Sequence, residues 1–254
     1  FWKFWHKILI FIHWDLSKMK NIHHVKNTKL VNEVFDNVYQ NYDLMNDIMS
    51  MGTHRIWKGQ FIDSIEVDKN QTIIDMSSGT GDITKLILKK SDHNTIYRVE
   101  PNFNMINNNI REFVKYKNVK NICAFAESVP LKDNSIDLYL ISFGLRNISK
   151  IDTGLKEAFR VLKKGGGFIC LEFYNVDQPI LKNLYSIYSK AIPLFGKIFN
   201  QNSKPYEYLT KSISDFHSKE EISNKLSESG FKNISIKNIF GGIAAIHYAW
   251  KLND

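Results

Sequence analysis

Short apolar runs rich in Ile, Val and Thr alternate with helix-like stretches between residues 72 and 173, and this alternation restricts the chain to few folds. The runs that predict strands are Thr72–Met76, Thr95–Val99, Ile122–Phe125, Ile136–Phe143 and Gly167–Phe173. The stretches between them that predict helices are Asp82–Lys90, Phe103–Lys115 and Ile151–Leu162. Strands and helices joined in this order by short links form parallel βαβ units with right-handed crossovers. The sequence therefore predicts an α/β domain with helices on both faces of a mostly parallel sheet.

The segments on either side of this core extend the domain. An apolar pattern of helical period fills residues 30–52, and Ile56–Ile65 predicts a second short helix. Residues 176–215 lose the alternation and are rich in apolar helical sequence, so we expect an inserted helical cap there. Two closing strands, Asn233–Phe240 and Ile243–Lys251, are joined by two glycines. Such a tight join predicts an antiparallel hairpin, which would end the parallel sheet in a reversed edge strand.

Residues 1–29 differ from the rest of the chain because they are basic and aromatic and contain one acid, Asp15. Their apolar run, Ile8–Ile12, is far too short to cross a bilayer. A basic leader with few acids resembles the end of an organelle transit peptide. An amphipathic segment lying on a membrane surface, or a frayed extension, remains the alternative. We therefore divide the chain into this leader and a single domain over residues 30–254.

The composition argues against two classes of function. The formal net charge is +8, but lysine is spread through the whole chain, which indicates base composition of the gene rather than a nucleic-acid-binding patch. No nucleic-acid partner is therefore expected. Cys123 and Cys170 are the only cysteines and form no CxxC motif, so the sequence predicts neither a disulfide framework nor a zinc site.

The run IIDMSSGTGDITKLIL passes from the first predicted strand through a glycine loop into a helix. It lacks the GxxxxGK[ST] phosphate loop, and Thr84 stands where a dinucleotide fingerprint needs its third glycine. Asp82 would repel a phosphate at the helix N-terminus and suits a cation. Glu100 ends the second strand, where a carboxylate can accept hydrogen bonds from both hydroxyls of a ribose. A ribose with a cationic tail and no phosphates describes S-adenosylmethionine, and a dinucleotide stays as the alternative.

Longer motifs carry a resemblance to a known family. They are YQNYDLMNDIMSMGTHRIWK, DMSSGTGD, AESVPLKDNSID, ISFGLRNI, RVLKKGGGFICLEF and GGIAAIHYAWK. Together they resemble the quinone C-methyltransferase family of ubiquinone and menaquinone biosynthesis, from about Glu33 to Lys251. The resemblance implies a class I S-adenosylmethionine-dependent methyltransferase fold, with a Rossmann-like sheet. It also implies methylation of a ring carbon of a polyprenyl benzoquinol or naphthoquinol.

The resemblance also implies a donor site, carried over position by position. Thr80 would lie against the methionine end of the donor, Glu100 would hold the ribose, and Ser142 would lie beside the donor. The full set of expected donor-binding residues is Asp75, Gly79, Thr80, Gly81, Glu100, Phe125, Ala126 and Ser142. Two positions depart from the family pattern. Phe125 replaces the usual Asn beside adenine, and Ser78 stands where Gly or Thr is more usual.

The expected chemistry requires no metal. Ionising a ring hydroxyl pushes electron density onto the neighbouring carbon, and a dry pocket favours its reaction with a sulfonium. Arg146 would stabilise the phenolate, Asn147 would orient the ring oxygen or a water, and Tyr42 would hydrogen-bond the quinol. Asp47 is expected to pair with His54 and Arg55 within a lid. His247 is interpreted as a structural residue, and the apolar cap as a surface for the prenyl tail.

Alternatives of other classes stay open at this point. The acceptor could be demethylmenaquinol instead of a benzoquinol, and the protein could be a non-catalytic scaffold with a methyltransferase fold. A sterol or other small-molecule methyltransferase is disfavoured by SFGLRN. The resemblance adds as partners the other enzymes of quinone biosynthesis in a membrane-associated complex, and a homodimer. The leader adds a mitochondrial location on the matrix side of the inner membrane, and hence favours ubiquinone.

Overall fold

The computed structural model describes residues 47, 50, 52–108, 110–175 and 204–252. Within these residues the chain forms one seven-stranded sheet in the order β3-β2-β1-β4-β5-β7-β6. The strands are β1 (Thr72–Met76), β2 (Thr95–Val99), β3 (Val119–Ile122), β4 (Ile136–Ser142), β5 (Leu162–Phe173), β6 (Lys232–Ile239) and β7 (Ala244–Trp250). The pairs formed by β1 to β5 are parallel. The chain therefore reverses its direction of travel across the sheet between β1 and β4, which is where ligands bind in open α/β sheets.

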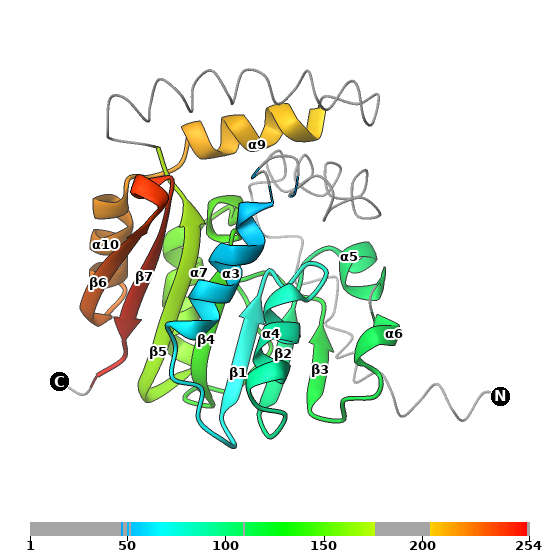
Figure 1. Ribbon diagram of the computed structural model, residues 1–254. Helices are drawn as coiled ribbons and strands as arrows, with labels where there is room; N and C mark the ends of the chain where they lie inside the picture. The colour runs from blue at the N-terminus through cyan, green and yellow to red at the C-terminus, as the bar shows by residue number, and fades with distance from the viewer. Residues whose placement is uncertain (1–46, 48–49, 51, 109, 176–203, 253–254) are drawn as a thin grey trace, which may run out of the picture.

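Helices cover both faces of the sheet (Figure 1). On one face lie α3 (Thr53–Asp63) and α4 (Asp82–Lys90), and on the other α7 (Ile151–Val161) and α10 (Lys219–Glu228). Each face has its own apolar cluster. Trp57, Phe61 and Ile87 are buried in the first, and Leu155 and Leu226 in the second. The prediction of helices on both faces of the sheet, made from the alternation of strands and helices, is therefore confirmed.

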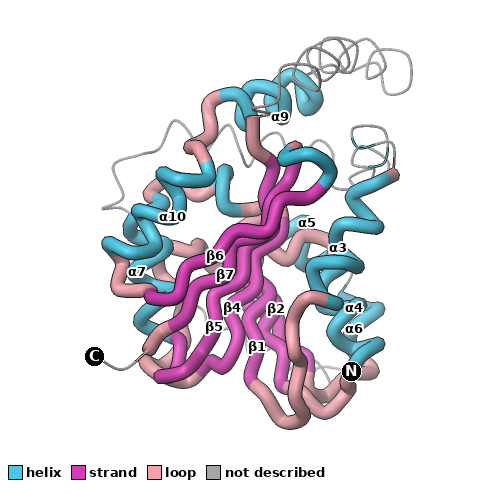
Figure 2. Tube along the Cα trace, turned by 60° about the vertical axis from the view of Figure 1, so that its left-hand side comes forward, coloured by secondary structure: helices cyan, strands magenta, loops and turns pink. Residues whose placement is uncertain are grey.

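The remaining elements lie around the ends and edges of the sheet. They are α5 (Phe103–Asn108), α6 (Ile110–Phe113), the 3₁₀ turns η4 (Leu145–Asn147) and η5 (Phe240–Gly242), and α9 (Lys204–Ser214). In Figure 1, α9 runs across the end of the sheet at which the parallel strands terminate, and Figure 2 shows the same placement from a second direction. Residues of the predicted cap before 204 lie outside the described part of the chain. Among the described residues, no helix is both long enough and apolar enough to span a bilayer.

Three details differ from the predicted pattern. The predicted helix Phe103–Lys115 forms two short helices, and β3 covers Val119–Ile122 instead of Ile122–Phe125. Val119 to Ile122 pair in register with Ile96 to Val99, after which the chain leaves the sheet. The reversed strand is also not the outermost one, because β7 lies between β5 and β6 and is antiparallel to both. The predicted hairpin is present, but its second strand turns inward and leaves β6 at the edge.

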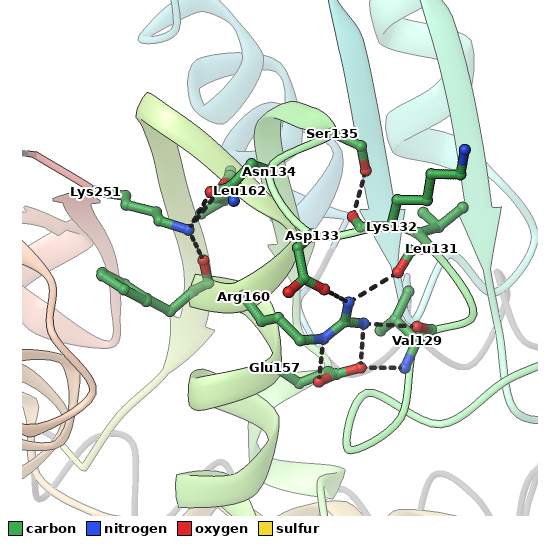
Figure 3. A network of polar contacts seen from close by, with 11 residues as sticks. Val129, Leu131, Lys132, Asp133, Asn134, Ser135, Glu157, Arg160, Leu162 and Lys251 are labelled. Atoms are coloured by element: carbon green, nitrogen blue, oxygen red, sulfur yellow. Dashed lines mark hydrogen bonds and ion pairs between the residues drawn. The ribbon is translucent and has the colours of Figure 1, made fainter.

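A polar network secures the opposite, amino-terminal end of β5 (Figure 3). The Arg160 guanidinium pairs with Glu157 and Asp133 and donates to the carbonyls of the preceding loop. The buried Lys251 ammonium donates to the carbonyls of Phe159 and Leu162 at 2.7 and 2.8 Å. Both cations therefore donate hydrogen bonds to backbone carbonyls that lie far from the carboxyl ends of the strands.

Candidate active site

The glycine loop between β1 and α4 is a tight, left-handed turn. Gly79 has φ 51° and Gly81 has φ 84°, a region that side chains with a Cβ atom avoid. A Cβ on Gly81 would also lie 2.6 Å from the Phe113 ring, so the position has no room for a side chain. Glycine at these positions is therefore required by the turn itself, and it leaves backbone N–H groups at the start of α4 close to any ligand.

Asp75 accepts hydrogen bonds from the first turn of α4, directly after the glycine loop. Its Oδ2 accepts hydrogen bonds from the Thr84 backbone N–H at 3.1 Å and from the Thr84 hydroxyl at 2.6 Å. The carboxyl is buried, and burial raises the pKa of Asp75 to about 6, although the Thr84 hydrogen bonds oppose this rise. Asp75 was expected among the donor-binding residues, and in the structure it fixes the first turn of α4.

Glu100 is buried at the carboxyl end of β2. Its two oxygens accept from the Gly79 N–H and the Asn102 N–H, each at 3.0 Å. Burial raises the pKa of Glu100 to about 7, against the effect of both hydrogen bonds. Each carboxylate oxygen still has acceptor capacity left, because a carboxylate offers about four lone-pair sites. The predicted ribose acceptor is therefore joined directly to the glycine loop.

The other expected donor-binding residues surround this loop. Thr80 and Ala126 are buried, Phe125 is half-buried, and Ser142 is the last residue of β4. The hydroxyl oxygens of Ser78 and Ser142 are buried and have no hydrogen-bond partner among the described residues. Buried polar atoms are rarely left unpaired in a folded protein. These two hydroxyls, Glu100 and the loop amides fit a polar ligand rich in hydroxyl and amino groups.

Arg98 is a site residue that the sequence analysis missed. It is fully buried on β2, and its guanidinium donates to the Gly79 carbonyl at 3.1 Å and to Asn121 Oδ1 at 3.0 Å. The guanidinium carbon lies 4.1 Å from the centre of the Phe113 ring. A signal was present in the sequence, because Arg98 interrupts an otherwise apolar predicted strand.

The SFGLRN segment packs directly against the glycine loop. A Cβ built on Gly144 would lie 2.5 Å from Ser77 Cβ, so only glycine permits this approach. Phe143 has a left-handed backbone (φ 56°), and its carbonyl accepts from Arg146 Nη1 at 2.7 Å. Strained backbone of this kind is concentrated at functional sites. The two motifs singled out in the sequence are therefore in contact at one edge of the sheet.

Arg146, the expected stabiliser of the phenolate, forms a buried ion pair. Its Nη1 lies 2.6 Å from Glu172 Oε1, and the side chains are 5% and 0% exposed. Glu172, at the carboxyl end of β5, also accepts from the backbone N–H groups of Arg146 and Phe173. Within the described residues the hydrogen bonds of the Arg146 side chain use Nη1 and Nε, and none uses Nη2. Glu172 is a second site residue that the sequence analysis missed.

Asn147 is held by the cap helix α9. The Tyr208 hydroxyl donates to Asn147 Oδ1 at 2.9 Å, and Arg146 Nε lies 3.4 Å from the Ser212 hydroxyl. These four side chains line a cavity of about 250 Å³ between η4 and α9. Tyr42, the third expected catalytic residue, lies outside the described residues. Tyr208 is thus the tyrosine that the structure brings to Asn147.

The predicted lid contacts are present in the described part of the chain. Asp47 accepts from Arg55 Nε and Nη2, both at 2.7 Å, and lies 3.7 Å from His54 Nδ1. The hydrogen bond from Arg55 lowers the pKa of Asp47. Burial lowers the pKa of His54 to about 4, so this imidazole is neutral at physiological pH. A second ion pair joins Lys58 of α3 to Asp82 at 2.8 Å and ties α3 to the start of α4.

His247 has the contacts of a structural residue. Its ring nitrogens lie 3.2 Å from the Tyr174 hydroxyl and 3.0 Å from the Lys219 carbonyl oxygen, and the side chain is fully buried. Burial lowers the pKa of His247. Across the described ranges, no group of three or more His, Cys, Asp or Glu side chains is arranged to hold a metal ion.

Comparisons with known proteins agree with this geometry. A model of the "ubiE/COQ5 methyltransferase family" matches residues 22–251. The ubiquinone/menaquinone biosynthesis C-methyltransferase UbiE of Rickettsia prowazekii is 43% identical over 92% of this chain and 97% of its own length. The UbiE protein of Rhizobium rhizogenes is 42% identical over 88% of this chain and 89% of its own.

Solved structures show the same fold. An S-adenosylmethionine-dependent methyltransferase from Aquifex aeolicus superposes with a TM-score of 0.57 at 16% identity, over 77% of this chain and 89% of its own. Phosphoethanolamine N-methyltransferase 2 of Haemonchus contortus, solved with S-adenosyl-L-methionine, gives 0.58 at 14% identity, over 78% and 52%. The class I methyltransferase fold expected from the sequence is therefore confirmed.

The predicted location is wrong. The leader favoured a mitochondrial protein on the matrix side of the inner membrane, but the curated relatives come from bacteria, including Rickettsia, Rhizobium and Agrobacterium. A bacterial protein is indicated. The error has a physical cause, because a basic aromatic stretch with few acids is not specific to organelle import and suits other charged or membrane-surface roles equally well.

Proposed function

The chain belongs to the ubiE/COQ5 methyltransferase family, and we propose that it methylates a ring carbon of a polyprenyl benzoquinol in ubiquinone biosynthesis, with S-adenosylmethionine as methyl donor. The observation that carries the proposal is the contact between the glycine loop and the SFGLRN segment at Ser77 and Gly144. A donor held by the first and an acceptor held by the second would meet at one edge of the sheet. Such positioning accelerates a reaction between two bound molecules.

The donor would be held by the loop and by the ends of β2 and β4. Glu100 would accept from the ribose hydroxyls, and the unpaired hydroxyls of Ser78 and Ser142 would complete its polar contacts. Phe125 would stack beside adenine, and Thr80 would contact the methionine end. When bound, the donor supplies an electrophilic methyl group carried on a sulfonium. These assignments are supported by the burial and hydrogen bonds of the residues and by the fold.

Arg146 would act on the acceptor. A quinol carbon becomes nucleophilic when the neighbouring hydroxyl ionises, so the site must stabilise the oxyanion. Arg146 cannot serve as a base because a guanidinium has no lone pair to accept a proton and acts only as a donor. Its Nη2 would donate to the ring oxygen while Nη1 remains on Glu172, and Asn147 would orient the same oxygen or a water. Glu172 already accepts three N–H donors, so the proton acceptor should be another group.

The partners expected from the family extend this proposal. The prenyl tail of the quinol would be drawn from a membrane, and the other enzymes of quinone biosynthesis would gather beside it. A homodimer is part of the same expectation. Cross-linking in cells and the mass of the purified protein in solution measure these associations, and neither is needed for the chemistry at Arg146.

The function is tested with purified protein, methyl-labelled donor and short-tailed quinols. We expect label on a ring carbon of the benzoquinol, and the corresponding naphthoquinol tests the menaquinone alternative. Calorimetry with S-adenosylhomocysteine and with NAD separates the two donor classes. A protein that binds S-adenosylhomocysteine but transfers no label to either quinol would be a scaffold, contrary to the proposal.

A further inference from the structure

Arg98 occupies a position where an arginine is costly. It lies on a central strand, fully buried, between the apolar residues Ile96 and Val99 on the same strand. Its Nε is buried without a hydrogen-bond partner among the described residues. Apolar side chains in such places are often as stabilising as buried charges, or more so. The fold alone therefore gives little reason for a cation here.

One hydrogen bond of Arg98 reaches the glycine loop, and its other contacts orient the guanidinium for it. The guanidinium donates to the carbonyl of Gly79, the residue whose N–H donates to Glu100. Its other hydrogen bond, to Asn121 on β3, and its stacking on Phe113 fix the plane of the guanidinium. A Cβ on Gly81 would lie 3.1 Å from the guanidinium carbon, so the side chain supports the loop from beneath at two glycines.

Arg98 also attracts two buried carboxylates electrostatically. The electrostatic attraction of Arg98 favours the ionised forms of Asp75 on β1 and Glu100 on β2, both of which burial disfavours. Glu112 of α6 acts on Arg98 in turn, and the thiol of Cys123, after β3, faces Glu100.

We propose that Arg98 is a positioning residue of the donor site, which fixes the glycine loop through the Gly79 carbonyl and so holds the Glu100 carboxylate in place for the ribose. This inference rests on the proposed function, because it assumes that an S-adenosyl group binds at this loop. Arg98 does not contact the reacting atoms. Its effect reaches the donor through Gly79 and Glu100.

The proposal predicts a dependence on pH that packing alone would not give. Donor binding requires ionised Glu100, so affinity should rise as the pH rises through about 7, the pKa of that carboxyl. Removing Arg98 takes away an attraction that lowers this pKa, so the rise in affinity should move to higher pH. A loop that is merely distorted would bind more weakly by the same factor at every pH.

The experiment measures binding of S-adenosylhomocysteine by calorimetry from about pH 6 to about pH 9. The proteins are the full chain with Arg98, Arg98→Met, Arg98→Lys and the control Lys251→Met. Lys251 is a matched control, because it is another buried cation that donates to backbone carbonyls, but at the far end of the sheet (Figure 3). Circular dichroism and an unfolding transition establish that each variant is folded.

We expect Arg98→Met to bind about fivefold or more weakly near pH 7 and by a smaller factor near pH 9, where Glu100 ionises without the guanidinium and only the loop contact is missing. Arg98→Lys should keep the wild-type midpoint, because the charge remains, but with lower affinity at every pH, because one ammonium cannot replace the planar donor pair. Lys251→Met should follow the wild-type profile. If Arg98→Met does not fold, Arg98→Gln, which also removes the charge but keeps a polar side chain, is measured in its place against the same expectation.

Two negative results would have different consequences, one for the proposed function and one for the role of Arg98. No binding of S-adenosylhomocysteine by the wild type at any pH would remove the proposed function itself. Normal wild-type binding with a deficit in Arg98→Met that is the same at all pH values, or absent, would leave the function standing and overturn the role of Arg98.

Discussion

Replacing Glu172 with Gln tests whether the buried ion pair supports both the fold and the chemistry. The change keeps the size of the side chain but removes the negative charge that faces Arg146 at 2.6 Å. Two opposite charges about 4 Å apart attract by about 4 kcal/mol at an effective dielectric constant of about 20. Breaking one partner of a buried pair costs about 3–5 kcal/mol, because the other charge stays buried and unpaired.

The expected loss of unfolding free energy in Glu172→Gln is larger than that of an ordinary substitution. A domain is stable by about 5–15 kcal/mol in total, so Glu172→Gln should remove a large share of the free energy of unfolding. The double variant Arg146→Met with Glu172→Met should regain most of that loss, because apolar side chains often replace a buried pair without penalty. It should nevertheless be inactive, because the guanidinium that stabilises the phenolate is gone.

The assay combines urea unfolding with single-turnover methyl transfer to a short-tailed quinol. We expect Arg146→Met and the double variant to bind donor normally and to lose about 10²–10³ in rate, the usual value of one oxyanion donor. Arg146→Lys should recover only part of it. The reasoning is refuted if the losses of unfolding free energy in Glu172→Met and Arg146→Met simply add in the double variant, or if Arg146→Met turns over at the wild-type rate.

Three further predictions concern the loop, the cap and the lid. Glu100→Ala removes the ribose acceptor and should weaken S-adenosylhomocysteine binding at least about tenfold by calorimetry, and unchanged affinity would exclude this donor placement. Tyr208→Phe removes the hydroxyl that donates to Asn147 and should slow turnover several-fold without altering donor affinity. That effect should vanish in an Asn147→Ala background if Tyr208 acts through Asn147. Arg55→Ala breaks an exposed pair with Asp47 and should cost less than about 1 kcal/mol in urea unfolding, so a loss as large as that of Glu172→Gln would contradict the exposure argument.

The sequence predicted the strands that carry their own signal. Apart from Asp75 and Arg98, Thr72–Met76 and Thr95–Val99 consist of apolar, aromatic and β-branched residues, and both strands were placed correctly. β3 was misplaced because Val119–Ile122 contains Lys120 and Asn121, which are tolerated at the edge of a sheet. The more apolar stretch up to Phe125 follows the strand as loop. Edge strands are specified by pairing with a neighbour, which a single sequence does not reveal.

The site residues also fall into two groups, those that a local sequence pattern reveals and those that only the folded structure reveals. Glu100 and the glycines were found because their spacing along one strand–loop–helix unit is a local pattern. Glu172 and Tyr208 reach Arg146 and Asn147 from β5 and α9, and only the folded sheet shows that these segments meet. Arg98 was missed because a charged residue inside a predicted strand was given no role. A buried charge in an apolar strand would have been the signal to follow.

The position of β7 in the sheet affects which half of the site can fold first during synthesis. β7 pairs with both β5 and β6 but follows them in the chain, so β5 keeps an open edge during synthesis until residues 244–250 have emerged. Unpaired strand edges are prone to wrong pairing, and contacts distant in sequence form slowly. The half with the glycine loop can close early, whereas the strand that carries Glu172 must wait for its partner. We therefore expect the donor side of this protein to assemble first, and the acceptor side to be the part that a ribosome pause or a premature stop would leave unfinished.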